Sequence, residues 1–156
     1  AVVIGRICRD VPVGRARDVI FGYTVANDVT ARDLQRSDGQ WARAKGYDTF
    51  CPLGPWITTH QQLDEVAALS IRTTLDGEQR QDGNTKDMIF PVPELVAYVS
   101  SYTTLLPGDV ILTGTPSGVG PMLPGQVVTI DIEGIGTLSN PVASASSDAS
   151  ASEAEQ

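Results

Sequence analysis

The segment from Gly22 to Gln35 constrains the fold most, because it changes within a few residues from a strand pattern to a helix pattern. Residues 20–26 are rich in β-branched and aromatic side chains, which is typical of a half-buried strand. Thr30 offers a hydroxyl N-cap for the helix, and Asp33 stands where a capping box has its acid. We therefore expect a strand that ends at a junction with a short helix.

The junction carries three polar side chains that can serve one pocket. Arg32 and Gln35 are spaced i and i+3 and share one helix face, while Asp28 lies just outside the helix. A carboxylate at a strand end can hold a hard cation, and a guanidinium with an amide can grip an acidic ligand. From the residues alone, the alternative is that Asp28 only caps the helix and that Arg32 only pairs with Asp33 or with a carbonyl at the surface.

The remaining pattern is that of a β-rich α+β domain. The pair Asp76-Gly77 predicts a hairpin turn, and residues 36–47 are polar and irregular. A helix is expected from about Pro93, with a stripe of apolar side chains along one face. Its stripe is Leu95, Val96, Val99 and Tyr102, and the other expected strands are Val2–Ile7, Ala68–Leu75, Val110–Thr113, Val127–Ile132 and Thr137–Val142.

Length and composition fit one domain. The 156 residues are 41% hydrophobic, and the net charge of −8 argues against a nucleic-acid partner. No run of roughly 18 apolar residues predicts a membrane span. Cys8 and Cys51 do not make a disulfide framework, and free thiols favour the cytoplasm. Residues 143–156 contain only Ala, Ser, Asp, Glu and a final Gln, so we expect a domain over 1–142 and a disordered tail over 143–156.

The stretch Asn27-Asp-Val-Thr-Ala-Arg-Asp-Leu-Gln35 resembles the signature of the fumarylacetoacetate hydrolase family. Further blocks follow in the family's order at residues 41–55, 81–90, 106–120 and 132–136. The segments around Asn27 and Lys45 look most like the small bacterial branch that includes 2-hydroxyhepta-2,4-diene-1,7-dioate isomerases and acylpyruvate hydrolases. The resemblance implies a mixed β-sandwich roll and a homodimer.

The resemblance also implies a metal site. In the family, the aspartate that matches Asp28 binds a divalent ion together with a Glu-x-Glu pair. Residues 1–5, Ala-Val-Val-Ile-Gly, resemble the strand that directly follows that pair. We therefore expect the two glutamates, and the lid with its acid–base histidine, to belong to a part of the catalytic domain that precedes Ala1. The ion is expected to be Mg²⁺, with Mn²⁺ and Ca²⁺ as alternatives.

The family assigns roles to further positions. Arg32 and Gln35 match substrate-binding residues, as do Gly114 and Thr115, and Lys45 matches a lysine that faces the metal-bound oxygen of the substrate. Without the resemblance, Lys45 is a solvated surface charge and the Thr113–Pro116 segment is a tight turn.

Four other chemically active residues receive no site role. His60, the only histidine, lies in a polar loop, and Cys51 is expected to be a small buried filler. Asp131 and Glu133 alternate with isoleucines, which indicates a solvated strand face.

The resemblance implies a metal-dependent enzyme that acts on 2-oxo, 2,4-dioxo or 2-hydroxy-dienoic dicarboxylic acids in aromatic or oxo-acid catabolism. Its reaction is C–C hydrolysis, decarboxylation or double-bond isomerisation through a metal-chelated enolate, and the sequence does not choose among them. The alternative is a catalytically inactive remnant that keeps only the fold and the dimer surface. A Glu-x-Glu pair encoded in frame upstream of Ala1 would favour the enzyme.

Overall fold

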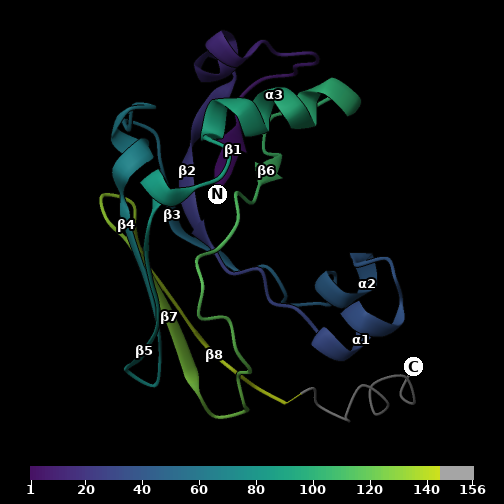
Figure 1. The fold of residues 1–156 in the computed structure, drawn as a ribbon, viewed down its shortest axis with the longest axis vertical. Helices are drawn as coiled ribbons and strands as arrows, with labels where there is room; N and C mark the ends of the chain where they lie inside the picture. The colour runs from purple at the N-terminus through teal and green to yellow at the C-terminus, as the bar shows by residue number, and fades with distance from the viewer. Residues whose placement is uncertain (145–156) are drawn as a thin grey trace, which may run out of the picture.

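The computed structural model describes residues 1–144. Two antiparallel sheets of four strands each form the body, with strand orders β3-β2-β1-β6 and β5-β4-β7-β8. Helix α3 covers one end of this body, and α1 and α2 stand out to one side of it (Figure 1). The β-rich α+β class expected from the sequence is confirmed.

The elements are short and closely spaced. The first sheet contains β1 (Val2–Ile4), β2 (Ile20–Ala26), β3 (Leu53–Thr58) and β6 (Val110–Ile111). The second contains β4 (Ser70–Leu75), β5 (Glu78–Asn84), β7 (Val127–Ile132) and β8 (Gly136–Pro141). The α-helices are α1 (Arg32–Ser37), α2 (Ala42–Lys45) and α3 (Val92–Tyr102), and the 3₁₀ turns are η1 (Val13–Asp18), η2 (Glu65–Ala68) and η3 (Thr85–Asp87).

Strand β1 lies inside the first sheet, between β2 and β6. All of its residues are buried, as expected for an uninterrupted apolar strand that is covered on both faces. The strand ends at Ile4 rather than at Ile7, which is 71% exposed. Beyond Ile4, the amide of Gly5 donates to the carbonyl of Val19, just before β2, and Cys8 then forms an isolated bridge with Leu105.

The two sheets and α3 share one hydrophobic core. Val25 of β2 and Val96 of α3 are fully buried, and Ile130 and Leu138 contribute from the second sheet. The expected stripe of α3 is wrong at Tyr102, which is 62% exposed and packs edge-on against Tyr98 instead.

Ser100 is buried on α3, although the expected apolar stripe does not include it. The side chain is fully buried, and its hydroxyl accepts a hydrogen bond from the amide of Val11 at 3.0 Å. The same hydroxyl donates to the carbonyl of Ala97 at 3.1 Å. Because both bonds satisfy the hydroxyl, burial of this polar group costs little.

The second sheet follows its sequence pattern closely. Asp76 and Gly77 both have positive φ angles, of 52° and 82°, and join β4 to β5 in the predicted hairpin. The Asp76 carboxylate also accepts from the amide of Val127 at 2.8 Å, which ties the hairpin to the start of β7. Along β7, Ile130 and Ile132 are buried while Asp131 is exposed, so the solvated face is confirmed.

Two elements differ from the expectation. Residues 36–47 are not irregular, because α1 continues to Ser37 and α2 forms around the fully buried Ala44. Strand β3 was missed because it contains Gly54 and Pro55, but it is an edge strand, where a proline removes no needed ladder bond.

No helix among residues 1–144 has both the length and the apolar character that crossing a membrane requires. Of the expected disordered tail, residues 145–156 lie outside the described residues.

Candidate functional site

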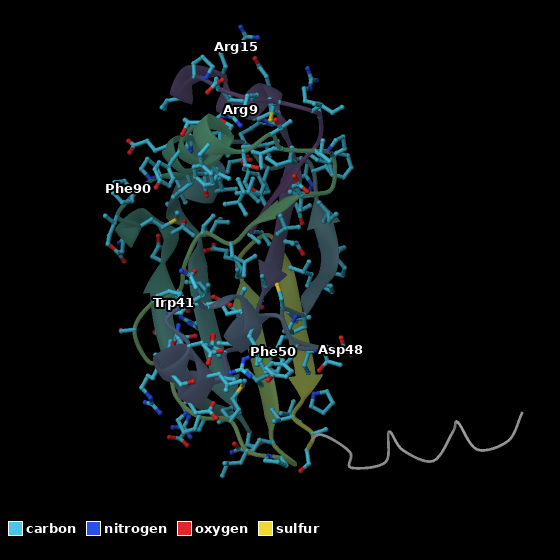
Figure 2. The ribbon with its side chains drawn as sticks, turned by 90° about the vertical axis from the view of Figure 1, so that its right-hand side faces the viewer. Arg9, Arg15, Trp41, Asp48, Phe50 and Phe90 are labelled. Atoms are coloured by element: carbon cyan, nitrogen blue, oxygen red, sulfur yellow. The ribbon has the colours of Figure 1, made fainter. Side chains whose placement is uncertain are left out.

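We call residues 27–52 the site arm, because this segment between β2 and β3 carries most of the candidate residues. Trp41, Asp48 and Phe50 mark it in front of the sheets in Figure 2. The arm returns to the sheet through a hydrogen bond from the amide of Asn27 to the carbonyl of Pro52, 3.1 Å long. The arm thus leaves the first sheet at the end of β2 and returns to it at the start of β3.

The arm brings Asp28 and Lys45 into direct contact, although 17 positions separate them in the sequence. The Lys45 ammonium donates to Oδ2 of Asp28, and it lies 3.4 Å from the hydroxyl of Thr30. It also lies 6.0 Å from the centre of the Trp41 ring, at the outer limit of a cation–π contact. The side chain of Lys45 is 30% exposed and that of Asp28 is 45% exposed, so both remain accessible to a ligand.

Arg32 and Gln35 form the second pair. Nη1 of Arg32 donates to Oε1 of Gln35 at 2.8 Å, as expected for two residues on one helix face. This bond occupies one lone pair of the Gln35 carbonyl oxygen and leaves the NH₂ group of the amide as a hydrogen-bond donor. The pair therefore keeps several N–H donors, from Arg32 and from the Gln35 amide, and such donors suit a carboxylate.

The predicted cap of α1 is wrong. The N-cap position belongs to Ala31, which makes no side-chain cap bond. The hydroxyl of Thr30 instead donates to the backbone carbonyl of Asp28 at 3.0 Å. The hydroxyl therefore stabilises the loop that presents the Asp28 carboxylate.

A further ion pair joins the two arm helices. The guanidinium of Arg43 donates to both oxygens of Asp38 at 2.7 Å each, and Ser37 adds a bond at 2.9 Å. These bonds to Arg43, then to Ser37, hold the pKa of the Asp38 carboxyl below its ordinary value of 3.8. The end of α1 is thereby attached to α2 by polar contacts.

Gly114 and Thr115 lie outside the arm, in a loop over residues 112–126 that we call the Thr115 loop. Gly114 has a φ of 110°, which favours glycine, and Thr115 is exposed. The Thr115 hydroxyl bonds to Gln81 of β5 at 2.9 Å. The sequence placed Gln81 in a family block but gave it no role, and only this contact identifies it.

The described residues bring the candidates together in pairs. Asp28 contacts Lys45, Arg32 contacts Gln35, and Thr115 contacts Gln81. Within residues 1–144, no hydrogen bond joins one of these pairs to another. A ligand common to all three pairs would therefore have to bridge them.

The junction fits a hard cation in donor type and not in donor number. Asp28 supplies carboxylate oxygens, the ligand type that Mg²⁺, Mn²⁺ and Ca²⁺ prefer. In the part of the chain that the structure describes, no three His, Cys, Asp or Glu side chains gather into a metal-binding group. Since such cations need about six oxygen ligands, the others would come from outside these residues, from water or from the substrate.

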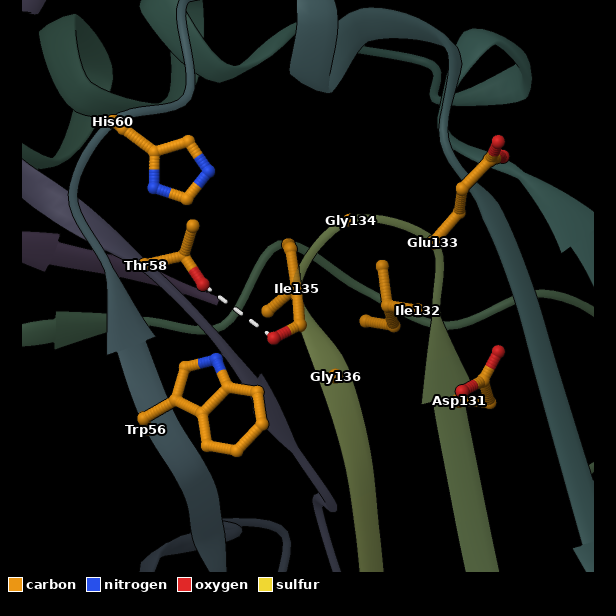
Figure 3. A pocket seen from close by; sticks show the side chains of 9 residues that line it. All are labelled: Trp56, Thr58, His60, Asp131, Ile132, Glu133, Gly134, Ile135 and Gly136. Atoms are coloured by element: carbon orange, nitrogen blue, oxygen red, sulfur yellow. Dashed lines mark hydrogen bonds between the residues drawn. The ribbon is translucent and has the colours of Figure 1, made fainter.

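A shallow hollow lies elsewhere, between the end of β3 and the β7–β8 turn (Figure 3). His60, Asp131 and Glu133 line it, but the side chain of His60 is exposed and none of the three was a site candidate. The hydroxyl of Thr58 donates to the carbonyl of Ile135 at 3.4 Å, so it is bonded to the backbone and not turned to a ligand.

Cys51, which lies in the arm and not in this hollow, is half-buried and forms no disulfide.

Comparison with known proteins matches residues 1–143 to the family model described as "Fumarylacetoacetate (FAA) hydrolase C-terminal". A protein of Mycobacterium tuberculosis is 57% identical over 142 residues, which are 91% of this chain and 54% of that relative. The chain therefore spans about half the length of this relative.

Solved structures give the same picture. A 5-carboxymethyl-2-hydroxymuconate delta-isomerase from Mycobacterium smegmatis has a TM-score of 0.89 at 54% identity, over 93% of this chain and 57% of that one. A maleylpyruvate hydrolase from Sphingobium sp. SYK-6, in complex with manganese(II) ion and pyruvate, has a TM-score of 0.83 at 39% identity, over 91% and 51%. The mixed β-sandwich roll expected from the sequence is confirmed.

Proposed function

This chain belongs to the fumarylacetoacetate hydrolase family, and from that premise we propose that the protein is a metal-dependent enzyme of small oxo acids. Its substrates would be 2-oxo, 2,4-dioxo or 2-hydroxy-dienoic dicarboxylic acids. The observation that carries the proposal is the contact of Asp28 with Lys45. It supports the proposal because it brings a carboxylate, the ligand type that hard cations prefer, next to an ammonium group that can donate a proton, on the same arm as Arg32 and Gln35.

A divalent cation would be held in part by Asp28 and would supply Lewis-acid polarisation of the substrate's oxo group. Mg²⁺ is the ion we propose first, with Mn²⁺ and Ca²⁺ as alternatives. The manganese ion in the maleylpyruvate hydrolase structure supports a divalent metal in this fold. The ligands that complete the coordination would lie outside residues 1–144, in keeping with the greater length of the relatives.

The arm supplies the contacts to the acid. The planar guanidinium of Arg32 suits bidentate hydrogen bonding to a carboxylate. The NH₂ group of Gln35 adds one more donor beside it. The Lys45 ammonium would leave Asp28 to stabilise negative charge that develops on the oxo oxygen, or to pass a proton there. The Thr115 hydroxyl and the backbone N–H groups of the turn at Gly114 would bind a carboxylate of the acid.

Among the three reactions of the family, we propose double-bond isomerisation first. The isomerase structure from Mycobacterium smegmatis is 54% identical to this chain, against 39% for the hydrolase structure. Hydrolysis and decarboxylation are the alternatives that the assay below also tests.

We also propose a cytoplasmic homodimer. Size-exclusion chromatography with light scattering would test the dimer, and cell fractionation would test the location.

The test is a turnover assay on the full-length protein. After treatment with EDTA, the protein receives Mg²⁺, Mn²⁺ or Ca²⁺ and then 2-hydroxyhepta-2,4-diene-1,7-dioate, an acylpyruvate or oxaloacetate. We expect metal-dependent turnover of the first compound, lost in Asp28→Ala and kept in Asp33→Ala, which removes an exposed carboxylate of the same arm. A folded protein that turns over none of the three with any metal would support the inactive remnant instead.

A further inference from the structure

Gln81 of β5 makes two hydrogen bonds to the Thr115 loop from a single atom. Its Nε2 lies 2.9 Å from Oγ1 of Thr115 and 2.8 Å from the carbonyl oxygen of Pro116. The Gln81 side chain is half-buried, while Thr115 is exposed. The bonds therefore connect a fixed strand residue to an accessible hydroxyl.

The chemistry of these partners fixes the direction of both bonds. A carbonyl oxygen only accepts, so the atom that faces Pro116 must be the NH₂ nitrogen of Gln81. That nitrogen has two hydrogens and spends one on each partner, which makes Oγ1 of Thr115 an acceptor. The single hydroxyl proton of Thr115 is then left to donate to another group.

Close backbone packing holds the loop against β5 on both sides of this contact. A Cβ on Gly118 would lie 2.0 Å from the carbonyl oxygen of Arg80, and one on Gly83 would lie 2.8 Å from Cβ of Pro116. Gly118 also has a φ of 102°, which favours glycine. These contacts already hold the loop in place. The bond from Gln81 to Thr115 is therefore not needed to position the loop, and its effect is to set the direction in which the hydroxyl donates.

We propose that Gln81 is a positioning residue that orients the Thr115 hydroxyl as a hydrogen-bond donor toward a carboxylate of the bound acid. This inference rests on the proposed function, which gives the site an oxo acid. A carboxylate is an acceptor only, so it requires a donor, and a rotating hydroxyl that donates to a nearby carbonyl would be lost to it. Gln81 disfavours that loss, because its NH₂ group already occupies one lone pair of the Pro116 carbonyl and one lone pair of the hydroxyl.

The experiment is a double-mutant cycle on the full-length protein, with Mn²⁺ and oxalate as the probe and calorimetry as the readout. Gln81→Leu and Thr115→Val should each weaken oxalate binding roughly ten- to a hundredfold, the value of one hydrogen bond to a charged group. The double variant should bind about as weakly as either single one, because both remove the same bond. Affinity for Mn²⁺ without oxalate should stay unchanged, which a merely structural defect would not allow.

Two further variants guard the interpretation. Gln79→Leu changes an exposed glutamine of the same strand and should bind oxalate as the wild type does. Gln81→Glu keeps the shape of the side chain but accepts from Thr115 and repels an anion, so it should bind oxalate at least as weakly as Gln81→Leu. It replaces Gln81→Leu in the cycle if that variant fails to fold.

The outcomes separate the two proposals. Wild-type binding that Gln81→Leu and Gln81→Glu leave intact would overturn the positioning role alone. Additive losses in the double variant would overturn it as well, since Gln81 would then act without Thr115. A wild type that binds no oxalate with Mn²⁺ would overturn the proposed function and this inference together.

Discussion

The core and the site arm are held by different forces. In the core, Val2, Ile4, Val25 and Val96 are almost completely buried. In the arm, α1 has no buried residue and α2 buries only Ala44. The arm is instead held by ion pairs and by hydrogen bonds such as that from the amide of Ala31 to the carbonyl of Ala44, 2.9 Å long.

This difference indicates that the core determines the stability of the fold and that the arm carries the residues for function. Burial of apolar area supplies most folding free energy, so the core should control stability. The arm exposes its polar groups and contributes little apolar burial, so its residues are available for chemistry. Substitutions in the core should therefore change the free energy of unfolding, whereas substitutions in the arm should change turnover or ligand binding.

The largest effect on stability is expected in the core. Ile4→Ala should lower the free energy of unfolding by about 2–5 kcal/mol, because the cavity left in a packed core adds to the lost transfer energy. Ile7→Ala, at a position 71% exposed, is the matched control and should change it by less than about 0.5 kcal/mol. Urea unfolding measures both, and equal losses would contradict the division into core and arm.

Apart from the complete loss expected in Asp28→Ala, the largest effect on function is expected at Lys45. Lys45→Met should lower turnover by about a hundredfold or more, the usual contribution of a group that transfers a proton or stabilises charge. The free energy of unfolding should fall by less than about 1 kcal/mol, since the pair with Asp28 is partly exposed. Arg36→Met removes an exposed cation of α1 and should keep full turnover. A large loss of stability in Lys45→Met would place this residue with the core instead.

A smaller effect should follow from changing the shape of one cation. Arg32→Lys keeps the charge but loses the planar fork, so oxalate should bind about tenfold more weakly in the presence of Mn²⁺. The unfolding midpoint should not move, because the Arg32 side chain is exposed. Calorimetric titration of the variant gives the answer, and unchanged affinity would remove Arg32 from the binding set.

The smallest effect concerns the pH dependence of the arm. The lowered pKa of Asp38 means that the folded state favours the carboxylate more than the unfolded state does. Its contribution to stability is present above the ordinary pKa of 3.8 and is lost as the pH falls through the lower value of the folded protein. In Arg43→Ala, an NMR titration should show the pKa of Asp38 rise toward its ordinary value. An unchanged pKa would show that Arg43 is not its cause.

The sequence predicted the parts whose pattern is local. Strand β7 and the Asp76-Gly77 hairpin were confirmed because alternation and turn residues act over a few positions. Helix α2 and buried Ser100 were missed, since tertiary contacts stabilise both. Asp28 was a candidate from its own segment, whereas Lys45 became one only through the resemblance. Gln81 became one only through its contact with the Thr115 loop.

The central claim is that the end of β2 and the arm form the metal and acid site. The most direct measurement is a crystal structure of the full-length protein grown with Mn²⁺ and oxalate, with the metal located by its anomalous signal. We expect the manganese directly bonded to a carboxylate oxygen of Asp28, with oxalate within hydrogen-bond distance of Arg32. Manganese held elsewhere, for example at Asp131 and Glu133, with Asp28 still paired to Lys45, would contradict the account.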